Sequence, residues 1–252
     1  MNGPLLYCCR MKTFFVSDLH LKPERPDLAK AYSEFLERAA PQADAIYVLG
    51  DLFEYWIGDD AADRIGARAV LDAMSAASQH TACYFIAGNR DFLIGDQFTL
   101  ETGFEVLADE TVVDLYGTPT LLLHGDSMCT DDVAHMAFRE DYVKNAKRKK
   151  LFLMLPISMR IKQAQAARQK SGKHKSQISM DIMDVTGATV DATFAKYNVS
   201  QMIHGHTHRQ HVHTHQNDCK RYVLGDWDQT SSILTATADG FSIDNFPIVP
   251  SY

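Results

Sequence analysis

The sequence contains no hydrophobic run long enough to span a bilayer, and it has little cysteine for its 252 residues. A transmembrane helix needs roughly 18 or more apolar residues in succession, and no stretch approaches that length. The first residues lack the apolar centre of a signal peptide. The five cysteines include no Cys-x-x-Cys pair. We therefore interpret them as reduced thiols of a cytoplasmic protein.

Internal repeats and low-complexity segments are also absent, and 46% hydrophobic with 23% charged residues is typical of a globular protein. Short apolar runs alternate with helical patterns, which predicts an α/β fold. Strands are expected at residues 13–17, 45–49, 82–87, 111–115, 119–124 and 199–204. We expect the folded core to span residues 11–252. Residues 1–10 are expected to be an N-terminal extension, because Met11 immediately precedes the first strand.

The pattern changes after residue 208, where four short β runs are separated by turns. These runs are HVHTH, RYVLGD, SSILTAT and FSIDNF, and Ala238-Asp239-Gly240 is typical of a hairpin. We expect these runs to form a second, largely antiparallel sheet. His211, His213 and His215 alternate along the first run, which places them on one face of a strand. They are assigned no function.

Positive charge is concentrated in residues 139–175, which contain 12 Lys and Arg against two acids, a net charge of +10 in a chain of −7. The apolar string LFLMLP, residues 151–156, lies within this segment. Basic flanks around an apolar centre favour an anionic membrane surface as partner, although solvated helical faces carry such charge too. The segment has only two aromatic residues, Tyr142 and Phe152, so nucleic acid is not expected as a partner.

Five apolar runs end in Asp, Asn or His: FFVSDLH, YVLGD, YFIAGNRD, LLLHGD and MIHGHTH. A single Gly-Asp after a strand usually indicates only a turn. In open α/β sheets, however, ligands bind beyond the carboxyl ends of the strands, and five strands would bring these side chains to one place. The candidate ligands are Asp18, His20, Asp51, Asn89, His124, His206 and His208.

Imidazole and oxygen ligands together favour first-row divalent ions such as Mn, Fe, Co and Zn. Seven ligands are too many for one tetrahedral ion, but they suit two ions that share a carboxylate. Two such ions, roughly 3.5–4 Å apart, can hold a phosphoryl oxygen and lower the pKa of bound water. The sequence therefore predicts a site for two divalent metal ions.

The order of these motifs over residues 18–208 resembles the calcineurin-like metallophosphoesterases. The resemblance implies an α/β fold, a sandwich of two β-sheets flanked by helices, with two metal ions and a metal-bridging hydroxide as the nucleophile. It further implies one ion held by Asp18, His20 and His208, another held by Asn89, His124 and His206, and Asp51 as the bridge between them.

The motif Gly88-Asn89-Arg90-Asp91 departs from the broad family, which usually has histidine in the place of Arg90. That histidine is expected to protonate a leaving alkoxide, whereas arginine holds phosphate oxygens and stabilises developing charge. We therefore expect a substrate whose leaving group departs without protonation, such as a phosphate monoester released from a pyrophosphate. Alternatively, Arg90 forms only an ion pair with Asp91 or another nearby acid.

Longer strings, among them VLGDLFEYWIGDD, CYFIAGNRDFLIGDQF and LLLHGDSMCTDD, resemble the UDP-2,3-diacylglucosamine hydrolase family of lipid A biosynthesis in Gram-negative bacteria. The resemblance implies hydrolysis of the pyrophosphate of UDP-2,3-diacylglucosamine by water attack at the α-phosphorus, which gives UMP and 2,3-diacylglucosamine 1-phosphate. It implies two Mn²⁺ ions, a helical cap at residues 127–190 inserted in the core, and a monomer peripheral to the cytoplasmic face of the inner membrane.

The resemblance also implies catalytic roles for Asp51, Asn89 and Arg90, and a set of substrate contacts. The matching contacts are Asn89, Arg90, Asp132, Ser171 and His206. Two further positions differ from the family pattern, because Lys175 and Ile178 stand where the family has asparagine and lysine. Lys175 is the candidate for supplying the displaced charge.

Three alternatives remain open. A nucleotide or other phosphate-ester phosphoesterase of the same superfamily would be expected to have histidine at position 90 and would need no basic, apolar cap. A scaffold that has lost catalysis would be expected to lack at least one of the seven ligands. A membrane-binding module built on residues 139–175 could exist together with catalysis.

Overall fold

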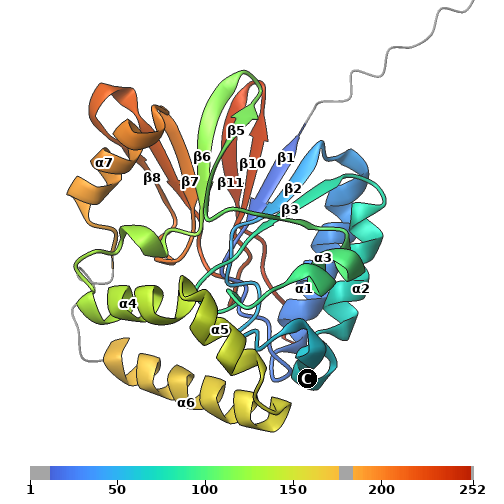
Figure 1. Cartoon of the computed structure of the whole chain (residues 1–252). Coiled ribbons are helices and arrows are strands. Elements are labelled where there is room, and N and C mark those ends of the chain that lie inside the picture. Colours follow the sequence, from blue (N-terminus) through green and yellow to red (C-terminus); the bar gives the residue numbers. More distant parts are fainter. Residues whose placement is uncertain (1–11, 176–183, 251–252) are drawn as a thin grey trace, which may run out of the picture.

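The computed structural model describes residues 12–175 and 184–250, which form two β-sheets between layers of helices (Figure 1). The first sheet has the order β11-β10-β1-β2-β3-β4, and the second has the order β5-β6-β7-β9-β8. In chain order the strands are β1 (Thr13–Val16), β2 (Ala45–Val48), β3 (Ala82–Ile86), β4 (Glu105–Leu107), β5 (Glu110–Leu115), β6 (Thr118–Leu123), β7 (Gln201–His204), β8 (His211–Thr214), β9 (Lys220–Val223), β10 (Ile233–Thr237) and β11 (Gly240–Asp244). The predicted sandwich is confirmed.

The first four strands of the first sheet, β1 to β4, run parallel, so their carboxyl ends lie at one edge. In the second sheet β6 and β7 are also parallel to each other. All six strands predicted before residue 205 are present, with ends that differ by no more than two residues. The candidate ligands follow the carboxyl ends of five strands, namely β1, β2, β3, β6 and β7.

The four strands expected after residue 208 are present, but the expectation that they form a second, largely antiparallel sheet of their own was wrong. The strands β8 and β9 join the second sheet beside β7, and β7 and β9 are parallel. The hairpin β10–β11 instead adds to the first sheet, where β10 pairs antiparallel with β1. Tyr222 of β9 and Leu234 of β10 therefore face each other's sheet within one shared core. The apolar side chains buried between the two sheets decide which sheet each of these strands joins, and the sequence pattern of a single strand does not reveal that choice.

Three apolar layers hold the sandwich together. Helices α1 (Pro26–Ala39), α2 (Arg68–Ser78) and α3 (Asp96–Thr102) bury residues such as Leu36 and Met74 against the first sheet. A middle layer with Phe15 and Ile203 lies between the sheets. Helix α7 (Gly187–Tyr197) packs Phe194 against the second sheet. The two flanking layers are visible on either side of the strands in Figure 1.

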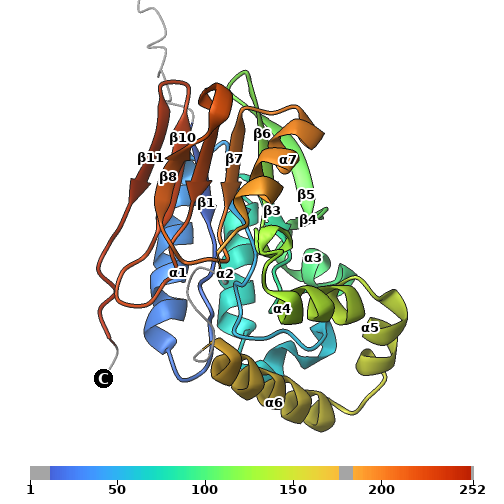
Figure 2. The same cartoon turned by 90° about the vertical axis from the view of Figure 1, so that its left-hand side faces the viewer.

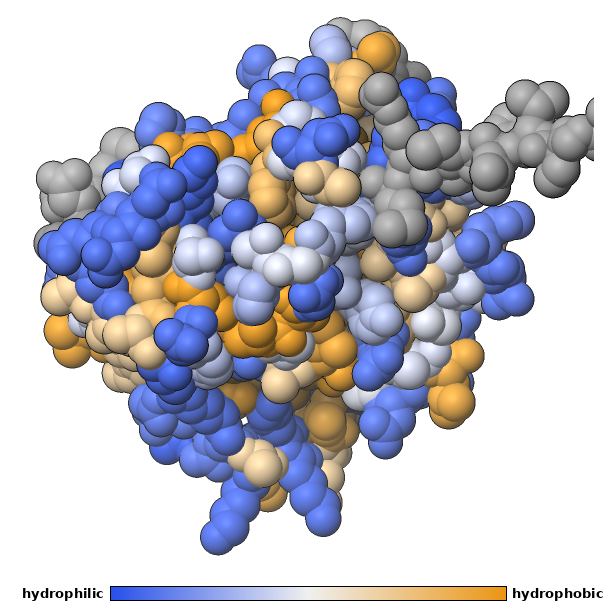
Figure 3. Space-filling view, turned by 90° about the horizontal axis from the view of Figure 1, so that it is seen from above, coloured by the Kyte–Doolittle hydropathy of each residue, from blue (hydrophilic) through white to orange (hydrophobic). Residues whose placement is uncertain are grey.

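Helices α4 (Val133–Phe138), α5 (Ala146–Leu153) and α6 (Ile157–Lys175) lie together at the end of the sandwich where the parallel strands finish (Figures 1 and 2). Phe152, Ile157 and Ile161 of this group pack against the core under α1 and α2. The opposite end of the molecule has a hydrophilic rim with apolar residues in its middle (Figure 3). Within the described ranges, no helix combines the length and apolar character needed to cross a membrane.

Several cations of the basic segment are paired with acids of the core rather than left in solvent. Arg139 is buried and contacts the carboxylates of Asp126 and Asp109. The other two pairs with the core are Arg160 with Asp60 and Arg168 with Glu54. These arginines fasten the helices to the sandwich, so the net charge of residues 139–175 overstates their exposed positive charge.

Candidate metal centre

Five of the seven candidate ligands have a left-handed backbone conformation directly after their strands. The φ angles are 56° at Asp18, 49° at His20, 53° at Asp51, 66° at His206 and 58° at His208. Non-glycine residues rarely adopt this conformation, which costs on the order of 1–2 kcal/mol each. Strain of this kind is concentrated at functional sites because the surrounding structure must enforce it.

Asp18, His20 and His208 form the first group of ligands. The two histidine Nε2 atoms are 3.2 Å apart, and Oδ1 of Asp18 lies 3.3 Å from Nε2 of His208 and 3.9 Å from Nε2 of His20. Oδ2 of Asp18 accepts hydrogen bonds from the Ser17 hydroxyl (2.6 Å) and the His206 backbone N–H (2.7 Å). These bonds hold the carboxylate so that its other oxygen faces the histidines.

The second group is built around His124. Its Nε2 lies 3.2 Å from Nδ1 of His206, 3.3 Å from Oδ1 of Asn89 and 3.5 Å from Oδ1 of Asp51. Its Nδ1 lies 2.8 Å from the Leu49 carbonyl oxygen, to which it donates. That hydrogen bond fixes the tautomer and leaves the Nε2 lone pair directed at the centre, as in histidines that ligate metals.

The buried charges of the two groups fit divalent cations. Burial raises the pKa of Asp51 to about 7. Burial opposes protonation of His124, but the Asp51 and Asp18 carboxylates outweigh it and raise its pKa to about 9. Oδ1 of Asp18 is buried and accepts no hydrogen bond among the described residues. A cation between the carboxylates would satisfy this oxygen and replace the protons that the cluster otherwise attracts.

The centre also contains acids that the sequence analysis missed. Asp226 follows β9 and approaches Nδ1 of His208 at 3.2 Å, a contact that orients a ligating histidine. Asp91 accepts the backbone N–H groups of Gly88 and Leu52, both at 2.7 Å, and so holds two of the loops together. Both residues had a sequence signal, because Asp226 repeats the strand–Gly–Asp pattern and Asp91 belongs to the Gly-Asn-x-Asp motif.

Arg90 points into the same region and does not pair with Asp91. Its Nε lies 3.4 Å from Oδ2 of Asp51, and its Nη1 lies 3.7 Å from Oε1 of Glu54. The side chain is buried, yet within the described residues neither Nε nor Nη1 makes a hydrogen bond, although Asp51 and Glu54 form ion pairs with the guanidinium. Buried donors that make no hydrogen bond are available to bind an anionic group such as phosphate.

The candidate substrate contacts in the helical segment lie on α4 and α6. Asp132 caps α4, because its Oδ1 accepts the His135 backbone N–H at 2.9 Å. Ser171 lies on α6, and the side chain of Lys175, like residue 178, falls outside the described part. His135, which the sequence analysis did not select, brings its ring within 5.1 Å of the His206 ring. Helix α4 therefore contributes an imidazole to the edge of the metal centre.

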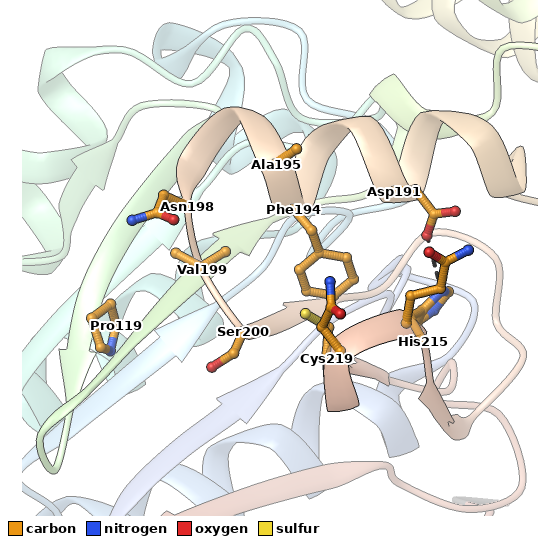
Figure 4. Close-up of a pocket in the computed structure, with 11 residues that line it drawn as sticks. Pro119, Asp191, Phe194, Ala195, Asn198, Val199, Ser200, His215 and Cys219 are labelled. Atoms are coloured by element: carbon orange, nitrogen blue, oxygen red, sulfur yellow. Dashed lines mark ion pairs between the residues drawn. The ribbon is translucent and has the colours of Figure 1, made fainter.

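A separate pocket of about 470 Å³ lies between α7 and the turn that joins β8 to β9 (Figure 4). Nδ1 of His215 lies 3.5 Å from Oδ1 of Asp191 on its wall, and Cys219 contributes a thiol. None of the seven candidate ligands lines this pocket. It is therefore distinct from the metal centre.

The chain also matches a known protein family. The family model of the calcineurin-like phosphoesterases matches residues 11–210, a range that contains both ligand groups. The chain belongs to the calcineurin-like phosphoesterases. Within this family it is similar to proteins named UDP-2,3-diacylglucosamine hydrolase.

Three such relatives illustrate the similarity. The protein of Xanthomonas campestris pv. campestris (strain 8004) is 43% identical over 94% of this chain and 100% of its own length. That of Histophilus somni (strain 2336) is 43% identical over 91% of this chain and 98% of its own. That of Actinobacillus succinogenes is 44% identical over 90% of this chain and 96% of its own.

Proposed function

We propose that this phosphoesterase hydrolyses the pyrophosphate bond of UDP-2,3-diacylglucosamine, giving UMP and 2,3-diacylglucosamine 1-phosphate for lipid A biosynthesis. The observation that carries the proposal is the pair of adjacent ligand groups with Arg90 beside them. The name shared by relatives that match over nearly their whole length supports the choice of substrate.

The residues present suit two Mn²⁺ ions. Asp18, His20 and His208 would hold one, and Asn89, His124 and His206 would hold the other. Asp51 would bridge them, because its Oδ1 faces His124 while its carboxylate is buried close to both groups. When bound, the ions supply a Lewis acid for the phosphoryl oxygens and lower the pKa of water.

Arg90 is proposed to bind and stabilise the phosphoryl group during cleavage of the anhydride. Its buried Nε and Nη1 donors, which make no hydrogen bond to the described residues, suit equatorial phosphate oxygens, whose charge grows as the bond breaks. Arginine cannot deliver a proton at neutral pH, because its pKa lies far above that range. The leaving sugar phosphate, with a second pKa near 6, departs without one. Asn89 would offer its Oδ1 to the second ion and the N–H groups of its Nδ2 to the substrate.

Residues 127–190 are proposed to act as a cap that binds the acylated part of the substrate. Asp132 and Ser171 lie on this segment, with Lys175 at the end of α6, whereas Asn89, Arg90 and His206 approach from the core. Phe152 and Ile161 of the cap already contact the apolar core near the centre. Apolar side chains at this junction are suited to acyl chains, and the basic residues are suited to phosphate.

We further propose that the chain is a monomer on the cytoplasmic side of the inner membrane, attached at an anionic surface and not to nucleic acid. Exposed apolar residues are concentrated on α5 and the beginning of α6, where Leu151 is 65% and Met154 is 73% exposed. Lys147 and Lys150 are exposed beside them. Apolar residues flanked by lysines suit the interface of an anionic bilayer.

The decisive experiment is UMP release in the presence of Mn²⁺. UMP release from UDP-2,3-diacylglucosamine and from its deacylated counterpart is compared with phosphate release from an alkyl phosphomonoester, glycerol 2-phosphate, under identical conditions. The proposal predicts a clear preference for the acylated substrate over the deacylated one. Equal or faster hydrolysis of the phosphomonoester would instead support the alternative of a general phosphoesterase and contradict the role given to Arg90.

A further inference from the structure

Glu54 is an acid close to the metal centre to which the proposed mechanism assigns no role. It lies three residues after Asp51, and its side chain is 23% exposed. Its Oε1 accepts a hydrogen bond from Nε of Arg168 on α6 at 2.7 Å. The same oxygen lies 3.7 Å from Nη1 of Arg90, and its Oε2 lies 4.0 Å from Nδ1 of His20. One carboxylate therefore faces a cap arginine, a phosphate-binding arginine and a metal ligand.

We propose that Glu54 is a positioning residue that couples the seating of helix α6 to the orientation of Arg90 and His20. The inference rests on the proposed function, which supplies both the substrate and the Mn²⁺ ions. In this arrangement, docking of α6 through Arg168 places the carboxylate, and the carboxylate then orients Arg90 toward the phosphate region and His20 toward the first ion.

The backbone around Glu54 supports such coupling because it is tied to the loop that carries His20. The Glu54 N–H donates to the Leu21 carbonyl at 3.0 Å, and the Leu21 N–H donates to the Leu52 carbonyl at 2.9 Å. The His20 N–H donates to the Asp51 carbonyl at 3.0 Å. These bonds join the loop that follows β1 to the loop that follows β2. They therefore fix the backbone of Glu54 relative to His20 and Asp51.

The electrostatic position of Arg90 explains why the carboxylate matters. Arg90 is buried, and its other acid contact is Oδ2 of Asp51 at 3.4 Å. Without Glu54, the guanidinium would be attracted to Asp51 alone and would compete with cations for the shared carboxylate. With Glu54 present, both carboxylates attract the guanidinium, so Arg90 is held beside Asp51 rather than directly on its carboxylate.

Energetics favour positioning over stabilisation as the role of the pair. Glu54 and Arg168 are 23% and 24% exposed, and ion pairs that reach solvent contribute about 0–1 kcal/mol to stability. Carboxylates that orient metal-ligating histidines, in contrast, typically change metal affinity or activity by about 10–100-fold when they are removed. Loss of Glu54 should therefore affect binding and catalysis much more than folding.

Helix α6 provides a matched control in the pair Arg160–Asp60. Nη2 of Arg160 lies 2.5 Å from Oδ2 of Asp60, and its Nη1 donates to the Ile57 carbonyl at 2.6 Å. This pair also fastens α6 to the core, but no contact joins Asp60 to Arg90 or His20 among the interactions of the described residues. Asp60→Asn thus removes one attachment of α6 but keeps the Glu54–Arg168 contact, through which the proposed coupling runs.

The test compares Glu54→Gln, Arg168→Met, their double variant and Asp60→Asn. The measurements are the melting temperature, Mn²⁺ affinity of metal-stripped protein by calorimetry, and kcat and KM for UDP-2,3-diacylglucosamine. Hydrolysis of bis(p-nitrophenyl) phosphate, which has no acyl chains, gives a readout that does not depend on the natural substrate.

Glu54→Gln is expected to weaken Mn²⁺ binding and lower kcat/KM by about 10-fold or more, with little change in melting temperature. Arg168→Met should raise KM for the acylated substrate, while its Mn²⁺ affinity should change less. The fold-loss of kcat/KM in the double variant should equal that of Glu54→Gln, not the product of the two single fold-losses. Asp60→Asn should leave Mn²⁺ affinity and kcat unchanged.

The proposal is overturned if Glu54→Gln matches Asp60→Asn in Mn²⁺ affinity and kcat, or if the effects of Glu54→Gln and Arg168→Met multiply independently. Failure of the proposed function has a different signature. The wild type would not hydrolyse UDP-2,3-diacylglucosamine, while the Mn²⁺ affinity and the diester assay would still separate Glu54→Gln from Asp60→Asn.

Discussion

The Nε2 atoms of His20 and His208 lie 3.2 Å apart although 188 positions separate these residues in the chain. His20 follows the first strand of one sheet, and His208 follows the third strand of the other. The first ligand group thus exists only when both sheets are packed together. Metal binding and folding of the sandwich should therefore stabilise each other.

Removal of metal should lower thermal stability. Protein treated with EDTA is expected to melt at a lower temperature than the same protein with added Mn²⁺. At a free ion concentration 100 times Kd, binding adds about 2.7 kcal/mol per site to the free energy of unfolding. Differential scanning calorimetry over a Mn²⁺ series measures the shift. A melting temperature that does not respond to Mn²⁺, Co²⁺ or Zn²⁺ would contradict the metal centre.

Asp51→Asn should abolish turnover without unfolding the chain. The amide keeps the shape but removes the charge that two ions would share, so kcat should fall on the order of 10³-fold or more. Burial disfavours the charged form of Asp51, so the metal-free variant should melt no lower than the metal-free wild type. Asp72→Asn, at an exposed position of α2, is the control and should retain full activity. Activity in Asp51→Asn comparable to that of Asp72→Asn would exclude Asp51 as the bridge.

Gly205→Ala should damage the first ligand group through a steric clash. A Cβ at this position would lie 2.1 Å from Oδ2 of Asp18 and 2.1 Å from Oγ of Ser17. Asp18 must then move, which should cost about 1–3 kcal/mol of stability and about 10-fold or more in Mn²⁺ affinity. Gly187→Ala, where a Cβ meets nothing within 4 Å, is the matched control. Equal Mn²⁺ affinity in the two variants would show that Asp18 does not need its present position.

Substitutions of Arg90 should separate phosphate binding from proton donation. Arg90→Lys keeps the charge but loses the planar fork, so kcat/KM for UDP-2,3-diacylglucosamine should fall about 10–100-fold. Arg90→His introduces a group that can protonate an alkoxide, so the ratio of rates for an alkyl phosphate ester over the pyrophosphate should rise. Steady-state kinetics with both substrates measures this ratio. A ratio that is the same in wild type and Arg90→His would refute the leaving-group argument.

Leu151→Asp and Met154→Asp should weaken attachment to membranes. Both side chains are more than half exposed on the cap, and an added carboxylate would be repelled by an anionic surface. Co-sedimentation with vesicles that contain phosphatidylglycerol should fall about 10-fold. Leu100→Asp on α3, where the side chain is 77% exposed, should bind vesicles like the wild type. If Leu100→Asp binds as weakly as the cap variants, the effect is one of net charge and not of a membrane-binding face.

The strands and the candidate metal ligands could be predicted because both depend on short-range patterns. An apolar run that ends in Asp or His defines a strand and a side chain at its carboxyl end, and parallel strands bring such ends to one edge. Asp226 shows the limit of this reasoning, since its Gly-Asp pattern was as clear as that of Asp51. Without the structure, nothing indicated that β9 lies parallel to β7 and ends beside His208.

The sequence by itself therefore determined the α/β class and the set of seven candidate ligands that the structure brings together, because ligand chemistry and strand periodicity are local properties of the chain. Only the tertiary structure decided which sheet each C-terminal strand joins, because pairing depends on the apolar surface that distant segments bury together. It also decided that Arg139, Arg160 and Arg168 form ion pairs that tie residues 139–175 to the sandwich. A count of charges cannot distinguish such pairs from an open basic surface, because the pairing arises only when two distant segments pack against each other.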